Sequence, residues 1–216
     1  MDFLNFVSWL CILITFGFYC SGFSTCQQFR ANKSTGDVPI LPFLATAINA
    51  ALWISYGTLK EDRTLILINT FGLLLQLVYI AVYFIYTANR SFARNRILMA
   101  GFVGCSLLTY ARYVNSVSRE SAIFQMGFTC NVMCVLMFAS PLSTVALVIR
   151  TKSTKSMSFL LSLATTAMGG CWFLYGTLVG DPFVQIPNAL GTILGGVQLL
   201  LFARYGLRSE PTSLPL

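Results

Sequence analysis

Charged side chains are scarce in this chain of 216 residues, and histidine is absent. Only 10% of the residues are charged, against about 25% in a typical soluble domain. Seven residues in all are acidic. The chain therefore lacks the usual ligands of a metal site and the usual general bases of a hydrolase. We expect no enzyme activity, no bound metal and no cofactor.

Apolar residues make up 56% of the chain, and the mean hydropathy is +0.73. A transmembrane helix needs about 20 mostly apolar residues, and seven intervals between charged residues offer such segments. Six of them are roughly 22 to 29 residues long. The fourth, between Arg96 and Arg112, holds only about 15 residues and spans only if Arg112 reaches the membrane surface. The sequence predicts a multi-pass integral membrane protein.

The lysine and arginine residues are unevenly divided between the two sides of the predicted membrane. About ten follow the odd-numbered segments and about four follow the even-numbered ones. Because cytoplasmic loops carry the excess of basic residues, we expect the N-terminus outside and the C-terminus in the cytoplasm. The glycosylation sequons at Asn32 and Asn89 then lie in the cytoplasm and stay unmodified. The alternative is a chance bias among short loops.

The sequence repeats itself at an offset of about 119 residues. Tyr56-Gly57-Thr58-Leu59 matches Tyr175-Gly176-Thr177-Leu178 in this register, which also pairs Trp53 with Trp172, Asp62 with Asp181, Asn69 with Asn188 and Gly72 with Gly191. From residue 21 to residue 86, roughly 21 of about 66 positions are identical. Apolar composition alone would not align Trp, Asn and Asp, so we interpret the match as an internal duplication.

Each repeat covers three predicted helices and leaves the fourth without a counterpart. We expect a first three-helix repeat at 3–88, a linker helix at 97–118, a second three-helix repeat at 122–206 and a short cytoplasmic tail at 207–216. One extra crossing between two triplets makes both enter the membrane from the same side. The predicted fold is an all-α integral membrane protein with seven transmembrane helices, arranged as two parallel three-helix bundles joined by an inverter helix (3+1+3). In such transporters the substrate binds near the midplane, between the repeats.

Polar residues that recur at the same depth in both repeats are candidates for a shared passage. Asn69 and Asn188 form the best pair, because a side-chain amide offers donors and acceptors that suit a neutral polyol. The alternative role is a hydrogen bond that only holds helices together. Trp53 and Trp172 could pack against a sugar ring, or they could anchor the chain at the membrane interface, the role we favour for the neighbouring tyrosines.

Three prolines lie in or near the predicted spans and remove backbone donors there. They are Pro42, Pro141 and Pro187, and each could act as a hinge or as a static kink. Every acidic residue lies at the edge of an apolar segment or in a loop. Since proton-coupled carriers usually place a carboxylate or histidine inside the bundle, passive transport is the simpler interpretation.

Together these motifs resemble the SWEET family of sugar transporters. The resemblance is carried by the two Lys-Ser-Thr loops, the two Trp-x-x-Tyr-Gly motifs, Ser140-Pro141-Leu142 and Ile186-Pro187-Asn188. It extends from about Gly17 to Tyr205, and the short tail is similar to that of the animal branch.

The resemblance implies a facilitative, bidirectional uniporter for mono- or disaccharides that works by alternating access. It also implies a central pocket that uses Asn69, Asn188 and Trp172. Plant members often have a small residue at the position of Trp53, so a monosaccharide such as glucose is expected here. The family has a proline in each of four helices, and in this chain Gly22 replaces the first of them. Pro42 and Pro141 match two of the four, and no proline occurs between Met157 and Leu163. The resemblance therefore suggests that gating relies on Gly22 and on a differently built sixth helix.

Two other classes of function remain open. One is a proton-coupled amino-acid exporter of the PQ-loop type, and the other is a seven-helix receptor or scaffold that transports nothing. The expected partners are a small-molecule sugar and membrane lipid, with no nucleic acid, and homo-oligomer formation is left open. The expected location is the plasma membrane, the Golgi apparatus or both.

Overall fold

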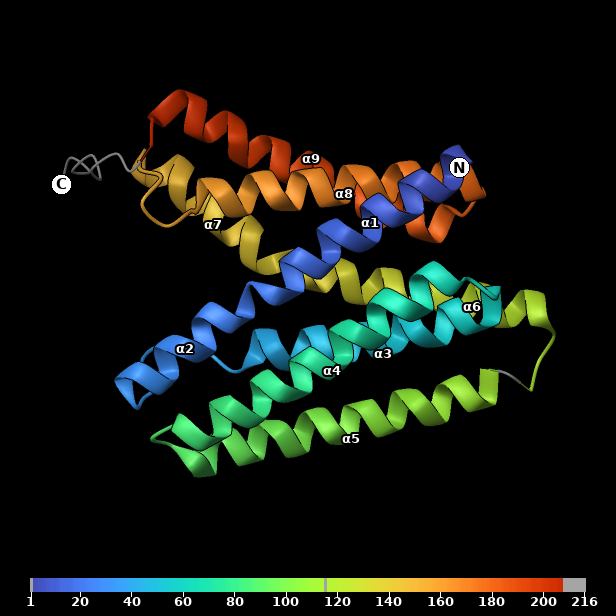
Figure 1. Ribbon diagram of the computed structural model, residues 1–216, viewed down its shortest axis with the longest axis horizontal. Helices are drawn as coiled ribbons and strands as arrows, with labels where there is room; N and C mark the ends of the chain where they lie inside the picture. Colours follow the sequence, from blue (N-terminus) through green and yellow to red (C-terminus); the bar gives the residue numbers. More distant parts are fainter. Residues whose placement is uncertain (1, 115, 208–216) are drawn as a thin grey trace. The chain divides into compact units, whose positions relative to one another are not determined.

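The computed structural model describes residues 2–114 and 116–207, and it is helical along most of that length (Figure 1). The helices are α1 (Phe3–Cys20), α2 (Gly22–Asn32), α3 (Leu41–Lys60), α4 (Arg63–Tyr86), α5 (Arg90–Val114), α6 (Arg119–Met137), α7 (Ala139–Thr151), α8 (Phe159–Val179) and α9 (Pro182–Tyr205). The tail predicted at 207–216 lies outside the described residues except for Leu207.

Most of these helices are long and apolar enough to cross a membrane. Six spans meet that standard by length and composition: Phe3–Asn32, Arg63–Tyr86, Arg90–Val114, Arg119–Thr151, Phe159–Val179 and Pro182–Tyr205. The first of them joins α1 and α2, and the fourth joins α6 and α7. Helix α3, which has 20 residues, is the seventh helix of this length. The prediction of an all-helical membrane protein with seven helices is confirmed.

The linker helix is longer at its start than the sequence suggested. The predicted range was 97–118, whereas α5 begins at Arg90 and ends at Val114. Intervals between charged residues mark the part of a helix that fits in hydrocarbon, not the helix itself. Arginine is a good helix former, so the helix continues through Arg90, Arg94 and Arg96.

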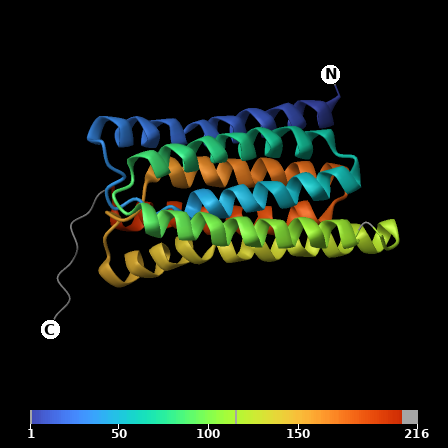
Figure 2. The ribbon, with the colours of Figure 1, turned by 90° about the horizontal axis from the view of Figure 1, so that it is seen from below.

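The chain divides into two compact units. The first-repeat unit is Thr15–Cys130, and the second-repeat unit combines Met1–Ile14 with Asn131–Leu216. Within the first-repeat unit α3 packs along α4, while α2 and α5 pack against this pair. Figure 2 shows the α2–α3 and α4–α5 connections at the same end of that unit. Within the second-repeat unit α8 packs along α9, and α7 also contacts α9.

The α3–α4 and α8–α9 connections are tight turns of the same design. Each first helix ends on a left-handed residue, Glu61 at φ 58° and Gly180 at φ 65°. The next residue is an aspartate whose carboxylate caps the second helix. Asp62 accepts from the Leu65 N–H (3.0 Å), and Asp181 accepts from the Phe183 N–H (3.0 Å). The recurring carboxylates are therefore helix caps, as their position after each apolar segment suggested.

The recurring Tyr-Gly motif lets the paired helices approach closely. A Cβ atom on Gly57 would lie 3.0 Å from the Leu65 Cβ, and one on Gly176 would lie 2.9 Å from the Gln185 backbone nitrogen. Both distances are shorter than ordinary van der Waals contact. The glycine is needed at this position in each repeat because any side chain would push the two helices apart.

Candidate functional site

Asn69 and Asn188 occupy matching positions in the two repeats. Asn69 lies on α4 and is buried, whereas Asn188 lies on α9 and is half-buried. Each amide donates to the carbonyl oxygen one turn earlier, Asn69 to Leu65 (2.9 Å) and Asn188 to Val184 (2.8 Å). This bond uses one of the two amide donors and holds the side chain against its own helix. The remaining donor and the amide oxygen are left for another partner.

Trp53 and Trp172 are also placed alike, each beside a tyrosine one turn later. The Trp53 and Tyr56 ring centroids are 5.6 Å apart at 87°, and those of Trp172 and Tyr175 are 5.4 Å apart at 82°. These are edge-to-face contacts. All four side chains are buried, and the two tyrosines are at most 4% exposed. The assignment of the tyrosines to the membrane interface is therefore wrong, because each one packs against its tryptophan within its own unit.

The tryptophan and the asparagine of each repeat lie at the same depth of their hairpin. Trp53 lies seven residues before the end of α3, and Asn69 lies six residues after the start of α4. At 1.5 Å per residue, both are about 10 Å from the turn. The same spacing holds for Trp172 on α8 and Asn188 on α9. Each repeat thus places an indole and an amide at the same distance from the turn that joins their helices.

An aromatic ring packs on the glycine one turn after each asparagine. The Tyr19 ring lies against Gly72, and the Phe138 ring lies against Gly191. The first contact is the tighter: a Cβ on Gly72 would overlap the Tyr19 ring, while one on Gly191 would lie 3.4 Å from the Phe138 ring. The internal repeat pairs the two glycines, but these aromatic partners were not identified from it. Adding 119 to Tyr19 leads to Phe138 and would have found them.

The first helix of each repeat is broken near the predicted hinge residues. The break between α1 and α2 falls at Ser21, directly before Gly22, and the break between α6 and α7 falls at Phe138, three residues before Pro141. A proline prevents the regular helical bonding of the turn before it, which explains the second break. The first is stabilised by Tyr79, whose hydroxyl donates to the Tyr19 carbonyl at 2.8 Å.

The other two candidate hinge residues sit in different surroundings. Pro42 lies in the first turn of α3, where a backbone donor has no helical partner, so it bends nothing there. Pro187 lies inside α9, directly before Asn188, and is buried. Of the two, only Pro187 removes a hydrogen bond from the interior of a helix.

Gln76 is a polar residue of α4 that the sequence analysis overlooked. It is buried, and its side-chain oxygen has no hydrogen-bond partner among the described residues. It lies seven residues after Asn69, which is two helical turns along the same face. The repeat could not reveal it, because its counterpart is Gly195. The spacing from Asn69 could have done so.

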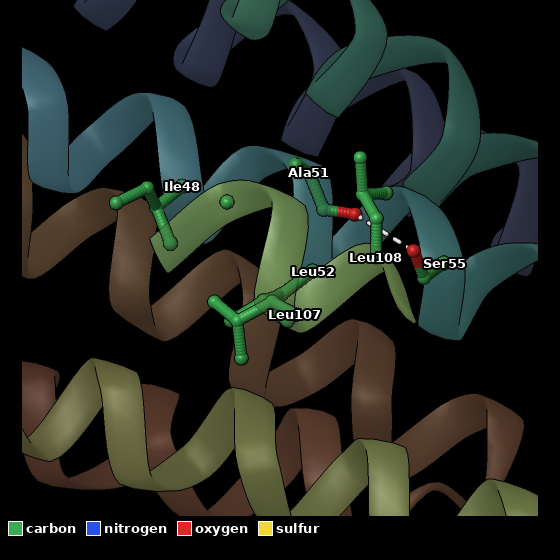
Figure 3. Close-up of a pocket in the computed structure, with 7 residues that line it drawn as sticks. Ile48, Ala51, Leu52, Ser55, Leu107 and Leu108 are labelled. Carbon is green, nitrogen blue, oxygen red and sulfur yellow. Dashed lines mark hydrogen bonds between the residues drawn. The ribbon is translucent and has the colours of Figure 1, made fainter. Parts of the chain in front are cut away.

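Figure 3 shows a pocket between α3 and α5 in the first-repeat unit. Its volume is about 20 Å³, room for about one water molecule. Its lining is almost wholly apolar and consists of Ile48, Ala51, Leu52, Ser55, Gly104, Leu107 and Leu108. The Ser55 hydroxyl is already bound to the Ala51 carbonyl at 3.0 Å. The pocket is too small and too apolar for a sugar, and it contains none of the candidate site residues.

The sequence was compared with known protein families and individual proteins. A family model described as "Sugar efflux transporter for intercellular exchange" matches residues 5–91 and again residues 124–210. The proteins named "Sugar transporter SWEET1" from Danio rerio and Homo sapiens are each 36% identical. The first match covers 95% of this chain and 94% of the relative, and the second covers 90% and 88%. That of Rattus norvegicus is 36% identical as well, over 93% of this chain.

A solved structure agrees with these sequence matches. The structure described as "The 3.7 A resolution structure of a eukaryotic SWEET transporter" superposes with a TM-score of 0.84 at 28% identity. The match covers 94% of this chain and 99% of the other. The predicted resemblance is thus confirmed, and so is the expectation that the chain is not an enzyme. The chain belongs to the SWEET family of sugar transporters.

Proposed function

We propose that this SWEET protein is an uncoupled, bidirectional uniporter for a monosaccharide such as glucose, working by alternating access. The observation that carries the proposal is the duplicated pair of one amide and one indole, at equal depth in each repeat. Relatives that are more than a third identical over nearly the full chain are named sugar transporters.

Asn69 and Asn188 bind the sugar hydroxyls in this proposal, and Trp53 and Trp172 pack against the ring. An amide can donate to one hydroxyl and accept from another, which matches a neutral substrate. The second amide donor and the amide oxygen, which the bond to the preceding turn does not use, can bind the hydroxyl groups of a sugar. The large Trp53 side chain narrows the passage, which supports a monosaccharide over sucrose.

The absence of proton coupling is supported by where the carboxylates lie. Asp181 is the one buried carboxylate among the described residues, and it caps α9. Asp62 caps α4, and Glu61 lies in the same turn at the helix end. None of these groups is near the depth of the asparagines, where a proton carrier would be needed. The chain has no histidine to take that role.

The moving parts in this proposal are the broken helices. The breaks at Ser21 and Phe138 interrupt the first membrane-spanning helix of each repeat, α1–α2 and α6–α7. Gly22 and Pro141 are the residues that favour these breaks. Pro187, directly before Asn188, removes one backbone hydrogen bond from the interior of α9. Pro42 is left out of the hinge set, because it sits where a proline is compatible with a straight helix.

Flux into proteoliposomes tests the proposal. Purified wild-type protein should equilibrate radiolabelled glucose faster than sucrose, and Asn69→Ala and Asn188→Ala should each slow glucose by at least tenfold at equal incorporation. A lost hydrogen bond to a neutral partner, worth about 0.5–1.5 kcal/mol, predicts up to roughly tenfold, and an orphaned partner group adds to the loss. Asn95→Ala is the matched control, because Asn95 is exposed on the first turns of α5.

Each part of the proposal can fail separately. Unchanged glucose flux in both asparagine variants would remove the site assignment. Faster sucrose than glucose would contradict the monosaccharide, and flux that follows an imposed pH gradient would contradict uncoupled transport and favour a PQ-loop-type carrier. No glucose flux at all would leave the receptor or scaffold interpretation.

The membrane arrangement is part of the proposal. We infer an N-terminus outside and a C-terminus in the cytoplasm, with three-helix repeats at 3–88 and 122–206 around the linker helix. The excess of basic residues in or beside the α2–α3, α4–α5 and α7–α8 connections supports this orientation. The plasma membrane or the Golgi is the proposed location, and an assembly of several copies is compatible with the extensive apolar surface of the helices.

A further inference from the structure

The start of α5 carries three arginines within seven residues. Arg90, Arg94 and Arg96 are all exposed. None of them has a carboxylate within ion-pair distance among the described residues, whereas Arg119 at the other end of the unit pairs with Glu61 at 2.8 Å. Unpaired guanidinium groups attract anions, and Arg binds phosphate oxygens well through its planar set of donors.

The same end of the first-repeat unit carries further positive charge. Phe29 at the end of α2 and Ala93 on α5 belong to one buried cluster, which brings the two helix ends together. Arg30 and Lys33 follow Phe29 and are exposed. Asp37 is the one acidic residue that the described part of the unit has at this end, since Glu61, Asp62 and Glu120 lie at the opposite end. The balance is five basic residues against one acidic residue.

An exposed apolar stripe lies directly beside these arginines on α5. Leu98 and Phe102 follow Arg94 on the same face of α5, at intervals of four residues, and they are 63% and 76% exposed. An exposed apolar stripe on a transmembrane helix faces lipid chains. At 1.5 Å per residue, Arg94 lies about 6 Å beyond Leu98, which is the level of the lipid headgroups. The Arg96 guanidinium lies over the exposed Phe92 ring at 4.9 Å, an arrangement suited to the interface.

We propose that the start of α5 is a binding site for an anionic phospholipid. The headgroup phosphate binds Arg94 together with Arg90 and Arg96, and an acyl chain lies along Leu98 and Phe102. In the orientation proposed above, the lipid belongs to the cytoplasmic leaflet, where anionic lipids are concentrated. The rule that cytoplasmic loops are basic explains the arginines alone. It does not explain the shortage of carboxylates, since acidic residues contribute little to that rule.

The test is native mass spectrometry of the full chain in detergent, titrated with phosphatidylserine or phosphatidylcholine. Each basic residue near an anionic surface contributes about 1 kcal/mol, which is about fivefold in affinity. Arg94→Gln should therefore weaken phosphatidylserine binding by about fivefold, and the triple glutamine variant by roughly a hundredfold. Arg112→Gln is the matched control, because Arg112 is an exposed arginine near the other end of the same helix.

Several results would overturn the proposal. These are a triple variant that retains phosphatidylserine as the wild type does, an equal loss in Arg112→Gln, or equal retention of phosphatidylcholine. Inorganic phosphate that displaces the lipid at equal concentration would assign the site to a free anion instead. A change in the number of chains per particle would assign the surface to a second copy. Arg94→Lys keeps the charge and should restore part of the affinity. None of these readouts measures sugar flux, so a negative result for the lipid site can be distinguished from a negative result for the proposed function.

Discussion

The two aromatic-glycine contacts allow one substitution to be tested in two nearly identical settings. Gly72→Ala places a methyl group where the Tyr19 ring lies, whereas Gly191→Ala places one 3.4 Å from the Phe138 ring, an ordinary contact distance. Both glycines lie inside long helices, where alanine is favoured over glycine by about 1 kcal/mol. Only the first substitution also forces a close contact.

The expected magnitudes follow from these two effects. Gly191→Ala should raise the free energy of unfolding by up to about 1 kcal/mol. Gly72→Ala gains the same helical preference, but overpacking a buried ring costs about 1–3 kcal/mol. Tyr19 is buried, so its ring cannot simply turn into solvent. The two variants should differ by about 1–3 kcal/mol, and Gly72→Ala should be the less stable.

Thermal unfolding of both variants in the same detergent, followed by tryptophan fluorescence, measures the difference. At about 2–4 °C per kcal/mol for a chain of this size, the midpoints should be separated by several degrees. Tyr19→Leu removes the ring and should make Gly72→Ala harmless in the double variant. Tyr19→Phe should not, because the ring atoms that meet the new methyl group remain. Equal midpoints for the two alanine variants, or a failed rescue by Tyr19→Leu, would refute the reasoning.

Three further predictions concern other parts of the chain. Gln76→Leu should raise the unfolding midpoint, because it removes a buried oxygen without a partner; the control is Gln125→Leu, whose oxygen lies 3.4 Å from the Tyr110 hydroxyl and should bring no such gain. Gly180→Ala should lower stability by about 1 kcal/mol, since φ is 65° there and no neighbour crowds the new methyl group, so the loss in the same assay reports the backbone alone. A membrane-impermeant amine reagent added to intact cells should label Lys60, with labelling read by peptide mass spectrometry. It should label three other lysines only after the membrane is permeabilised. The reverse pattern would show that the orientation is the opposite one. Those three are Lys33, Lys152 and Lys155.

The membrane spans and the matching positions of the repeated residues could be predicted from the sequence, because charged residues bound the spans and the repeat aligns the two halves of the chain. A charge rarely lies inside hydrocarbon, so intervals between charges locate the membrane-spanning part of each helix. They do not locate the helix end, which is why α5 begins at Arg90. The recurrence of Asn69 and Asn188 in one repeat register predicts that they lie at equal distances from the start of their helices, and they do.

The remaining features depend on contacts between distant residues. Tyr56 and Tyr175 look like interfacial residues by composition, but each is enclosed by its tryptophan and by the close approach of the next helix at Gly57 or Gly176. Gln76 has no counterpart in the other repeat, so a search for recurring positions passes over it. No proline near Ser21 indicates the break there. The hydroxyl that stabilises it belongs to Tyr79, which is 60 residues from its acceptor Tyr19 in the sequence.

The division of the chain at Ile14 and Asn131 has a consequence for biogenesis. Residues 3–14 of α1 belong to the same compact unit as α7, α8 and α9. At about 5–20 residues per second, the ribosome needs on the order of ten seconds to proceed from Ile14 to Asn131. During that time the first segment sits in the translocon or in lipid before its packing partners exist. Its exposed apolar side chains, among them Phe3, Phe6 and Trp9, are compatible with contact with lipid during that time.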